Sequence, residues 1–478
     1  MLIGQAICEL FRKEYDMTKY IEYFQVEAKC LLKDFKKNIP EAKSRCEKYF
    51  SNRDSLSLMN TQHVIAKEYG FDSWNDLIKQ ESHKLAEALI VAKNKTLKNP
   101  FKLWHGGRII TGYEENKYKL HSPEDYQFKY DINKKTFVSL RSSLMSFEHL
   151  DVSDYDISGM DPLKIRYTED TKWPEDISKL PERFNPKELL ETRKNPGLGI
   201  RTLHKQGLKG QNRNVVIIDG FRLFNHMEYH NSLKGYEEIG LDPTNYGGGV
   251  NGGLLSSIAG KTCGIAPNAN AYYYAVNTEN RTQVYYAIAI NKVCELHRKL
   301  KSEGKTGIDV IHIQGAISNE LFKTDEGYED ALKAKKEAEA LGIWCNIDNK
   351  FAENKFFREE RVFCKLDGNI ENPFDYELTE YSPLHKIPRT QKELFVNSLC
   401  FPGGARTIAL NVKMDEYAFE SCSGPLSKAY ATGLYLLAKS VKEDITPYEF
   451  FDTCLKTGMF KEGVGTIINP VALIESLR

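Results

Sequence analysis

The chain carries no net charge, because 66 lysine and arginine residues balance 66 aspartate and glutamate residues among its 478 residues. This balance removes the electrostatic attraction by which nucleic acids and anionic membranes bind basic proteins, so we expect neither as the main partner. No uninterrupted apolar run reaches the roughly 18 residues that a transmembrane helix requires. The sequence therefore predicts no membrane span.

Paired cysteines are also missing. The ten cysteines are scattered along the chain without a C-x-x-C pair, so neither a zinc-binding cysteine motif nor a disulfide framework is indicated. The apolar start, Met1–Leu10, is short and has neither a basic region nor a cleavage site, so we expect no signal peptide. These absences favour a cytoplasmic location, with specialised secretion left open. We also expect no cofactor.

Three regions of the chain differ in their residue patterns. Residues 1–95 are predicted to form a helical domain, because apolar residues recur at three- and four-residue steps, and Asn60 or Thr61 is expected to cap one of its helices. Residues 96–188 are rich in aromatic and charged residues, and their apolar patterns are short and interrupted. The region ends in a linker that contains several prolines. This second region is predicted to be a mixed α/β connector and linker. Residues 189–478 form the third and largest region.

Strand-like and helix-like patterns alternate along the third region. Apolar runs predict strands at 215–218, 271–276, 308–313 and 342–347 and near 396–412, with an irregular insert at 348–393. Amphipathic runs predict helices at 250–259, 283–300 and 327–341 and a final helix pair. This alternation is typical of an α/β domain with a doubly wound parallel sheet and helices on both faces.

Asp219 follows the most apolar of the predicted strands. In open α/β sheets, functional sites lie outside the carboxyl ends of the strands, so Asp219 stands where a site is expected. A carboxylate at a strand end is also an ordinary cap for the following turn. A glycine-rich segment, Tyr246–Gly253, comes next and leads into the helix predicted at 250–259.

These features together resemble the subtilisin-like serine proteases, in particular a bacterial group without signal peptides. The resemblance rests on the strand ending in Asp219, the glycine-rich helix start, the segment Gly264–Ala269 and the segment Gly424–Gly433. His226 and Glu228 also resemble the H-x-E segment that follows the family's aspartate. The resemblance covers roughly residue 140 to the C-terminus, and it implies a peptidase fold.

Two of the three catalytic positions that the resemblance implies are occupied by unsuitable residues. The family's histidine position falls on Val250 or Tyr246, depending on how the glycines are aligned, and no histidine occurs between His230 and His297. The family's serine position falls on Pro425. Valine, tyrosine and proline supply neither an imidazole base nor a serine hydroxyl. Only Asp219 of the triad remains.

The resemblance also implies roles for other residues. Ile313, Gln314 and Gly315 align with the strand end that pairs with a bound peptide, and Asn346 or Asn349 aligns with the oxyanion region. His226 and His230 have the spacing of a metal-binding pair on a helix, with Glu228 as a third ligand, but a helix-period pair alone is weak evidence and we expect no metal there.

Three functional hypotheses remain open. We favour an inactive protease homologue whose cleft binds a peptide or protein, and pairing with a protease relative is a further option for its partner. The second is an active peptidase with a rebuilt site, using Cys422 or Ser423 and a histidine from elsewhere such as His385. The third is an interaction protein that works through the helices of residues 1–95.

Overall fold

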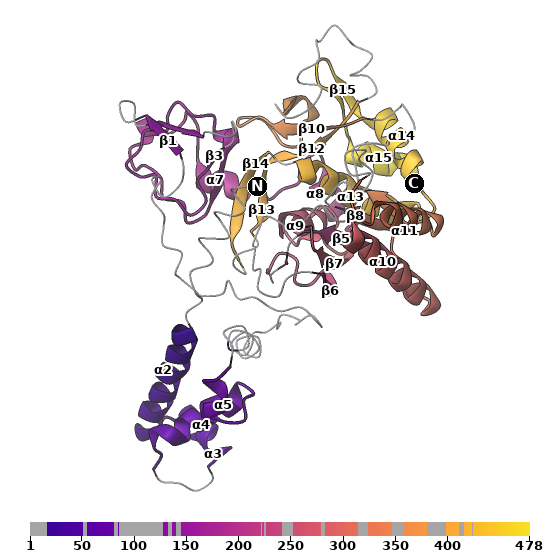
Figure 1. The fold of residues 1–478 in the computed structure, drawn as a ribbon. Coiled ribbons are helices and arrows are strands. Elements are labelled where there is room, and N and C mark those ends of the chain that lie inside the picture. Colours follow the sequence, from indigo (N-terminus) through magenta and orange to yellow (C-terminus); the bar gives the residue numbers. More distant parts are fainter. Residues whose placement is uncertain are drawn as a thin grey trace. The chain divides into compact units, whose positions relative to one another are not determined.

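A computed structural model of the chain is shown in Figure 1. It describes residues 17–50, 55–80, 85, 128–131, 136–139, 145–220, 222–223, 226–240, 252–278, 283–313, 324–346, 358–379, 398–410, 415–422 and 424–478. The contacts between residues divide the chain into two compact units, residues 1–114 and residues 115–478. The division predicted from the sequence, at about residues 95 and 188, remains a prediction.

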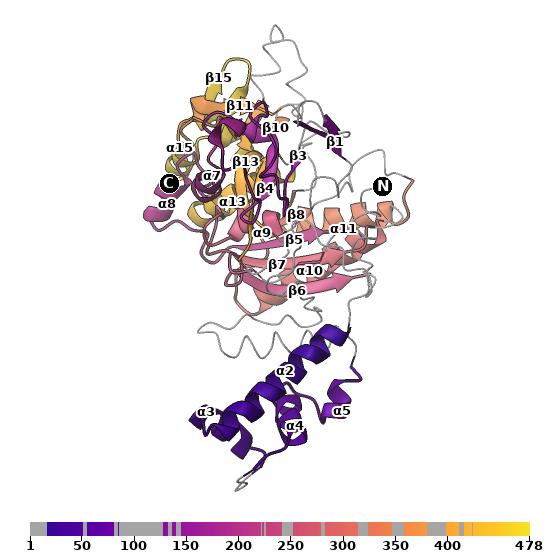
Figure 2. The ribbon, with the colours of Figure 1, turned by 90° about the vertical axis from the view of Figure 1, so that its left-hand side faces the viewer.

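The first unit is helical in its described part (Figure 2). Its helices are α2 (Met17–Lys36), α3 (Pro40–Glu47), α4 (Leu58–Glu68) and α5 (Trp74–Leu77). Their apolar faces share one core, in which Phe24, Ala28, Val64 and Ile65 are fully buried. None of the helices in the part of the chain that the structure describes is both long and apolar enough to cross a membrane.

The start of α4 corrects one expectation. Ser57, and not Asn60 or Thr61, is the N-cap residue, because the Ser57 side chain accepts a hydrogen bond from the Asn60 amide. The Asn60 side chain accepts one in return from the Ser57 amide at 2.9 Å. This reciprocal pair satisfies two amides at the first turn, and asparagine here takes the place of the usual Glu or Gln.

A five-stranded parallel sheet forms the centre of the second unit. Its strands are β5 (Asn214–Asp219), β6 (Leu233–Ile239), β7 (Asn270–Val276), β8 (Val310–Ile313) and β9 (Trp344–Asn346). Their order in the sheet is β6-β7-β5-β8-β9, and every neighbouring pair is parallel. All the strands predicted here from apolar runs are present. β6 was not predicted, because its glutamates and lysine interrupt the apolar pattern.

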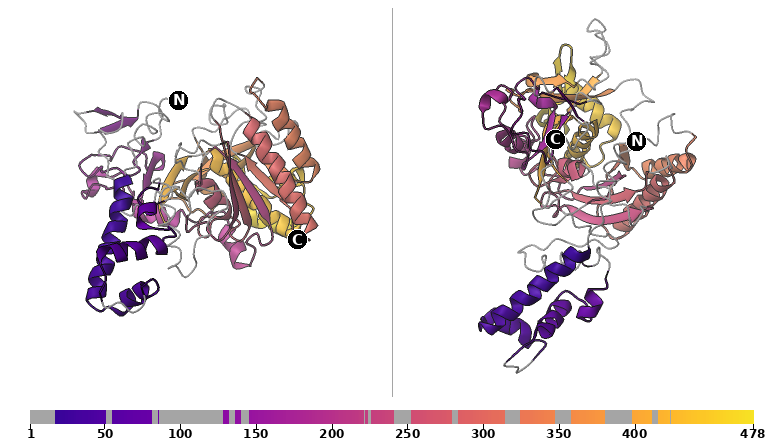
Figure 3. Two further views of the ribbon diagram at one scale, coloured as in Figure 1. Left: turned by 60° about the horizontal axis from the view of Figure 1, so that its bottom comes forward. Right: turned by 60° about the vertical axis from the view of Figure 1, so that its left-hand side comes forward.

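Helices cover both faces of this sheet (Figures 1 and 3). Side chains of a strand alternate between its faces. Val216, Ile218 and Ile311 belong to one face and pack in a core with α10 (Val284–Ser302) and α11 (Tyr328–Ala340). On the other face, His312 bonds to α13 (Gly424–Val441), which packs against α9 (Gly252–Ala259). The predicted fold class, α/β with a parallel sheet between two helical layers, is confirmed.

Further strands extend the second unit. A mixed sheet has the order β11-β10-β12-β16-β15, formed by Tyr376–Leu378, Arg358–Cys364, Ser398–Pro402, Gly465–Ile467 and Met459–Lys461. A four-stranded sheet has the order β13-β14-β4-β3, formed by Gly404–Ala409, Tyr417–Cys422, Ile165–Thr168 and Met145–Ser146. The described part of residues 348–393 therefore holds two paired strands, β10 and β11, so the expectation of an irregular insert is wrong. The reason is that β10 is highly charged, and its strand pattern is hidden in the sequence.

The remaining elements complete the second unit. A two-stranded hairpin pairs β1 (Phe128–Asp131) with β2 (Thr136–Ser139). Four short helices are α7 (Pro186–Thr192), α8 (Ile200–Lys205), α14 (Pro447–Thr457) and α15 (Pro470–Leu477). Single 3-10 turns lie at Pro162–Lys164, Ile177–Lys179 and Pro373–Asp375.

Gly433 lets helix α13 approach the segment before β7. A Cβ atom at this position would lie 2.7 Å from the Cβ atom of Ile265, which is fixed to the backbone. We expect Gly433→Ala to lower the free energy of unfolding by about 1–2 kcal/mol, because the overlap outweighs the better helix propensity of alanine. Urea unfolding of both proteins measures this change. Ser440→Ala on the same helix is the control and should alter stability by less than about 0.5 kcal/mol. An unchanged or stabilised Gly433→Ala protein would contradict the close approach.

Candidate functional site

The parallel sheet has a switch point between β5 and β8. From the carboxyl end of β5 the chain moves outward to β6, whereas from the carboxyl end of β8 it moves to β9 on the opposite side. Ligand sites of open α/β sheets lie at such a point, outside the carboxyl ends of the strands. Asp219 is the last residue of β5 and Ile313 the last residue of β8, and Ile218 pairs with Ile313. Both predicted residues therefore lie at this edge.

The carboxylate of Asp219 is buried, with 2% of the residue exposed. Its Oδ1 accepts a hydrogen bond from the Gly220 amide at 2.7 Å, and Oδ2 is buried without a well-aligned donor among the described residues. Burial raises the pKa of Asp219 to about 7, although the Gly220 amide and the Tyr273 hydroxyl favour the ionised form. No described histidine forms a hydrogen bond to this carboxylate.

The other positions implied for the triad are only partly described. Pro425 is the second residue of α13, where its missing amide removes no hydrogen bond of the helix. Val250 and Tyr246 lie outside the described residues, as do Gln314, Gly315, Asn349, Ser423 and His385. Cys422 ends β14, and its side chain is not described. The roles given to these residues remain predictions.

His226 and Glu228 hold the turn after β5 in place. The imidazole of His226 is fully buried; Nε2 donates to the Glu416 carbonyl at 2.8 Å, and Nδ1 accepts from the Glu228 amide at 3.0 Å. These two bonds fix one neutral tautomer, and burial lowers the pKa of His226 to about 4. Both ring nitrogens are therefore occupied by the protein itself.

The Glu228 carboxylate is a buried acceptor for four donors. It is 2% exposed and accepts hydrogen bonds from the amides of Thr262 and Cys263, from the Thr262 hydroxyl at 2.8 Å and from the Tyr417 hydroxyl at 2.9 Å. This carboxylate joins the turn after β5, the segment after α9 and strand β14. His226 and Glu228 thus act structurally in the described part of the chain.

A buried polar cluster lies between the sheet and α13, and sequence reasoning missed most of it. His312 Nδ1 lies 3.0 Å from the Thr432 hydroxyl, which also accepts a hydrogen bond from Asn346 Nδ2 at 3.0 Å. All three residues are at most 2% exposed. Burial, followed by the charge of Lys428, lowers the pKa of His312 to about 3, so its ring is neutral. A histidine inside an apolar strand was the signal in the sequence that could have drawn attention to this cluster.

The position of Asn346 bears on the predicted oxyanion region. Its side-chain amide donates to Thr432 and, at 3.4 Å, to the carbonyl of Lys428, so the described amide faces α13. The Thr432 hydroxyl and the neighbouring His312 imidazole are the types of group that serve as a nucleophile and its base. Both side chains are fully buried, however, and inaccessible to a substrate. An oxyanion role for Asn346 or Asn349 remains a prediction.

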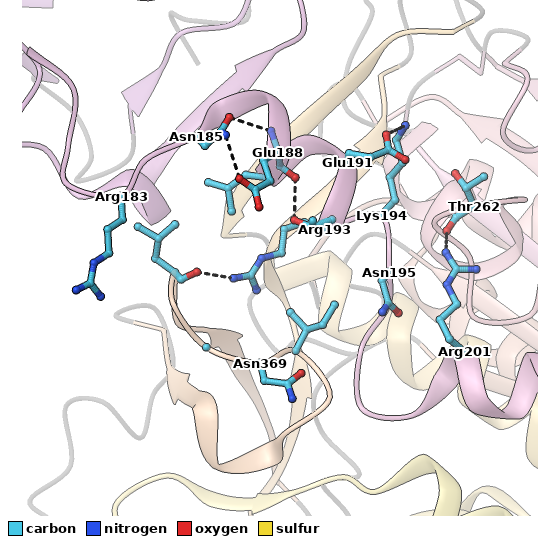
Figure 4. Close-up of a pocket in the computed structure, with 15 residues that line it drawn as sticks. Arg183, Asn185, Glu188, Glu191, Arg193, Lys194, Asn195, Arg201, Thr262 and Asn369 are labelled. Atoms are coloured by element: carbon cyan, nitrogen blue, oxygen red, sulfur yellow. Dashed lines mark hydrogen bonds and ion pairs between the residues drawn. The ribbon is translucent and has the colours of Figure 1, made fainter. Parts of the chain in front are cut away.

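A separate polar pocket lies beside α7 (Figure 4). It has a volume of about 750 Å³ and is lined by α7, the segment after it, Thr262 and the turn at 366–370. Its cations are bound by the protein: Arg193 donates to the Lys365 carbonyl at 2.7 Å, Arg201 donates to the Thr262 carbonyl, and Lys194 pairs with Glu191 at 2.7 Å. The pocket includes none of the site residues predicted from the sequence.

Comparisons with known proteins complete the description of the site. No family model matches the chain, and no curated protein matches it. Among solved structures, the chain is similar to the PatG macrocyclase in complex with peptide, at 14% identity over 58% of this chain and 95% of the other, with a TM-score of 0.39.

Two further solved structures are similar at the same level. One is a protease from Pseudoalteromonas arctica, at 15% identity over 62% of this chain and 98% of the other, with a TM-score of 0.41. The other is a cold adapted subtilisin-like serine proteinase, at 12% identity over 54% of this chain and 89% of the other, with a TM-score of 0.37. Similarity this low assigns no function to any residue of this chain.

Proposed function

We propose that this protein is a catalytically inactive subtilisin-like homologue that binds a peptide or protein at the carboxyl edge of its parallel sheet. The observation that carries the proposal is the state of Asp219. Its carboxylate is buried, bonded to the Gly220 amide and not to a described histidine. An aspartate that orients no imidazole cannot perform the role that it has in a Ser-His-Asp triad.

Two further features support the absence of peptidase chemistry. The sequence offers no histidine between His230 and His297, and Pro425 occupies the serine position implied by the resemblance. A site without a base and a nucleophile retains only the modest acceleration that binding and oxyanion donors supply. We further propose a cytoplasmic location and association with a peptide, a protein or a protease relative.

Activity-based labelling tests the inactivity. We expect a fluorophosphonate probe to label no residue selectively and an iodoacetamide probe to label Cys422 no faster than the exposed Cys30. We also expect peptide libraries incubated with the protein to stay intact, as measured by mass spectrometry. Cys422→Ser and Ser423→Ala are the matched variants for the rebuilt site. Labelling or cleavage that either change abolishes would establish the active peptidase, with His385→Ala then testing the source of the base.

Photo-cross-linking tests the binding edge. A photoreactive residue placed at Gln314, directly after β8, should capture extended peptides that form main-chain hydrogen bonds with the segment following that strand, beyond the ends of its pairing with β5 and β9. The same residue placed at Lys299, which is exposed near the end of α10, is the control and should capture few. Equal capture at both positions would argue against peptide binding at this edge, and partner binding that is lost only on deletion of residues 1–95 would favour the N-terminal helices instead.

A further inference from the structure

Three polar side chains from distant parts of the sequence meet at one edge of the four-stranded sheet. His149 follows β3, Asp170 follows β4, and Glu416 precedes β14. β3 and β4 are parallel, and β14 is antiparallel to β4 with Ala418 opposite Thr168. The ends of β3 and β4 and the start of β14 therefore lie at the same edge.

The distances between these side chains fit a shared ion. Nδ1 of His149 lies 3.0 and 2.9 Å from the two carboxylate oxygens of Asp170 and 3.6 Å from Oε1 of Glu416. Each residue offers one atom able to ligate a metal, a ring nitrogen or a carboxylate oxygen, and these three atoms lie within 4.8 Å of one another. Two ligand atoms held about 2.0–2.1 Å from one tetrahedral ion are about 3.3 Å apart. The separations from Nδ1 bracket this value, so small shifts bring the three residues onto one ion.

The local charge also favours a bound cation. The Glu416 side chain is 4% exposed, and the Asp170 side chain is 32% exposed. A divalent cation held by both acids would interact favourably with the buried Glu416 carboxylate and with Asp170.

Further hydrogen bonds hold the three groups in position. The Thr168 hydroxyl donates to Asp170 Oδ1 at 2.6 Å and accepts from the His149 amide at 3.0 Å. The carbonyl of Glu416 accepts from His226 Nε2 at 2.8 Å. Outer contacts of this kind orient metal ligands and raise the affinity of a site.

We propose that His149, Asp170 and Glu416 bind one divalent transition-metal ion. One imidazole nitrogen and two carboxylates form a donor set that suits Zn²⁺, and Mn²⁺ as a weaker alternative. The ion joins the ends of β3 and β4 to the start of β14 and so fastens the region before residue 171 to the rest of the second unit. This role is independent of the peptide-binding function proposed above.

Calorimetric titration of the full chain tests the site. Protein freed of metal with EDTA and then dialysed should bind one equivalent of Zn²⁺. His149→Ala and Glu416→Gln should each lower the affinity by about 100-fold or more, and Thr168→Val, which removes no ligand, by about 10-fold, as expected for a contact that orients a ligand. His63→Ala in the N-terminal helices is the matched control and should leave the affinity unchanged.

Cobalt absorption identifies the ligands. Co²⁺ at this site should give weak d–d bands, whereas a thiolate-to-cobalt band would assign binding to a cysteine such as the exposed Cys30 and overturn the proposal. Absence of saturable Zn²⁺ and Mn²⁺ binding, or unchanged binding by a His149→Ala protein with native circular dichroism, would overturn it too. If the ligand variants do not fold, the Thr168→Val protein still tests the site, because unchanged Zn²⁺ affinity of this variant would contradict the proposal.

Discussion

Replacement of Glu228 by alanine is expected to lower the free energy of unfolding by about 4 kcal/mol, because it leaves one buried and three partly buried donors without an acceptor, at about 1–3 kcal/mol for each buried donor and less for the others. The donors are the amides of Thr262 and Cys263 and the hydroxyls of Thr262 and Tyr417. Such a loss is a large share of the stability of an ordinary domain. Urea unfolding monitored by circular dichroism measures it, with the thermal midpoint as a second reading.

Two variants make this result specific to Glu228. Glu228→Gln keeps the size of the side chain but turns an NH₂ group toward the donors, so it should destabilise the protein by a smaller but clear amount, about 1–3 kcal/mol. Glu303→Ala removes an exposed glutamate paired with Lys305 and should change stability by less than about 1 kcal/mol. A Glu228→Ala protein as stable as Glu303→Ala would show that the four bonds contribute little.

Asp219→Asn is expected to stabilise the protein at neutral and alkaline pH. The pKa of Asp219 is raised from 3.8 to about 7 because burial disfavours the ionised carboxylate. Between these two values the folded state binds the proton that the unfolded state has lost, so this group lowers stability as the pH rises from about 4 to about 7. Asparagine keeps an oxygen acceptor for the Gly220 amide and carries no charge. At pH 8 the variant should therefore exceed the natural protein in unfolding free energy by about 2–4 kcal/mol.

Unfolding of both proteins at several pH values separates this effect from other titrations. Near pH 4 the two proteins should be almost equally stable, and the difference should grow until about pH 7 and then level off. Asp156→Asn, at a partly exposed aspartate that accepts hydrogen bonds from Ser158, should show no such gain. A constant difference between pH 4 and pH 8 would mean that Asp219 is ionised in the folded protein throughout this range.

The sequence was a good guide where residue patterns are local. The apolar run 215–218 and the helix pattern at 283–300 correspond to β5 and α10, because burial on both faces of a strand, or on one face of a helix, leaves a direct periodic signal. β6 and β10 were not predicted because their charged side chains hide the strand pattern, and pairing with β7, β11 and β12 stabilises them instead.

For the candidate site, too, the sequence revealed the features with a local pattern and missed those that depend on distant contacts. Asp219 was predicted at a strand end, and it lies there. The cluster of His312, Thr432 and Asn346 joins residues up to 120 positions apart, so no local pattern could reveal it. The same holds for His149, Asp170 and Glu416, which sheet pairing brings to one edge.

By itself, then, the sequence determined the α/β class, the place of Asp219 at a strand end and the lack of a histidine between His230 and His297, because composition and periodicity depend on the residues alone. Only the tertiary structure decided the burial of Asp219, its raised pKa and the partners of Glu228 and His149. The physical reason is that desolvation and hydrogen bonding depend on which distant segments pack together, and that packing is a property of the whole fold.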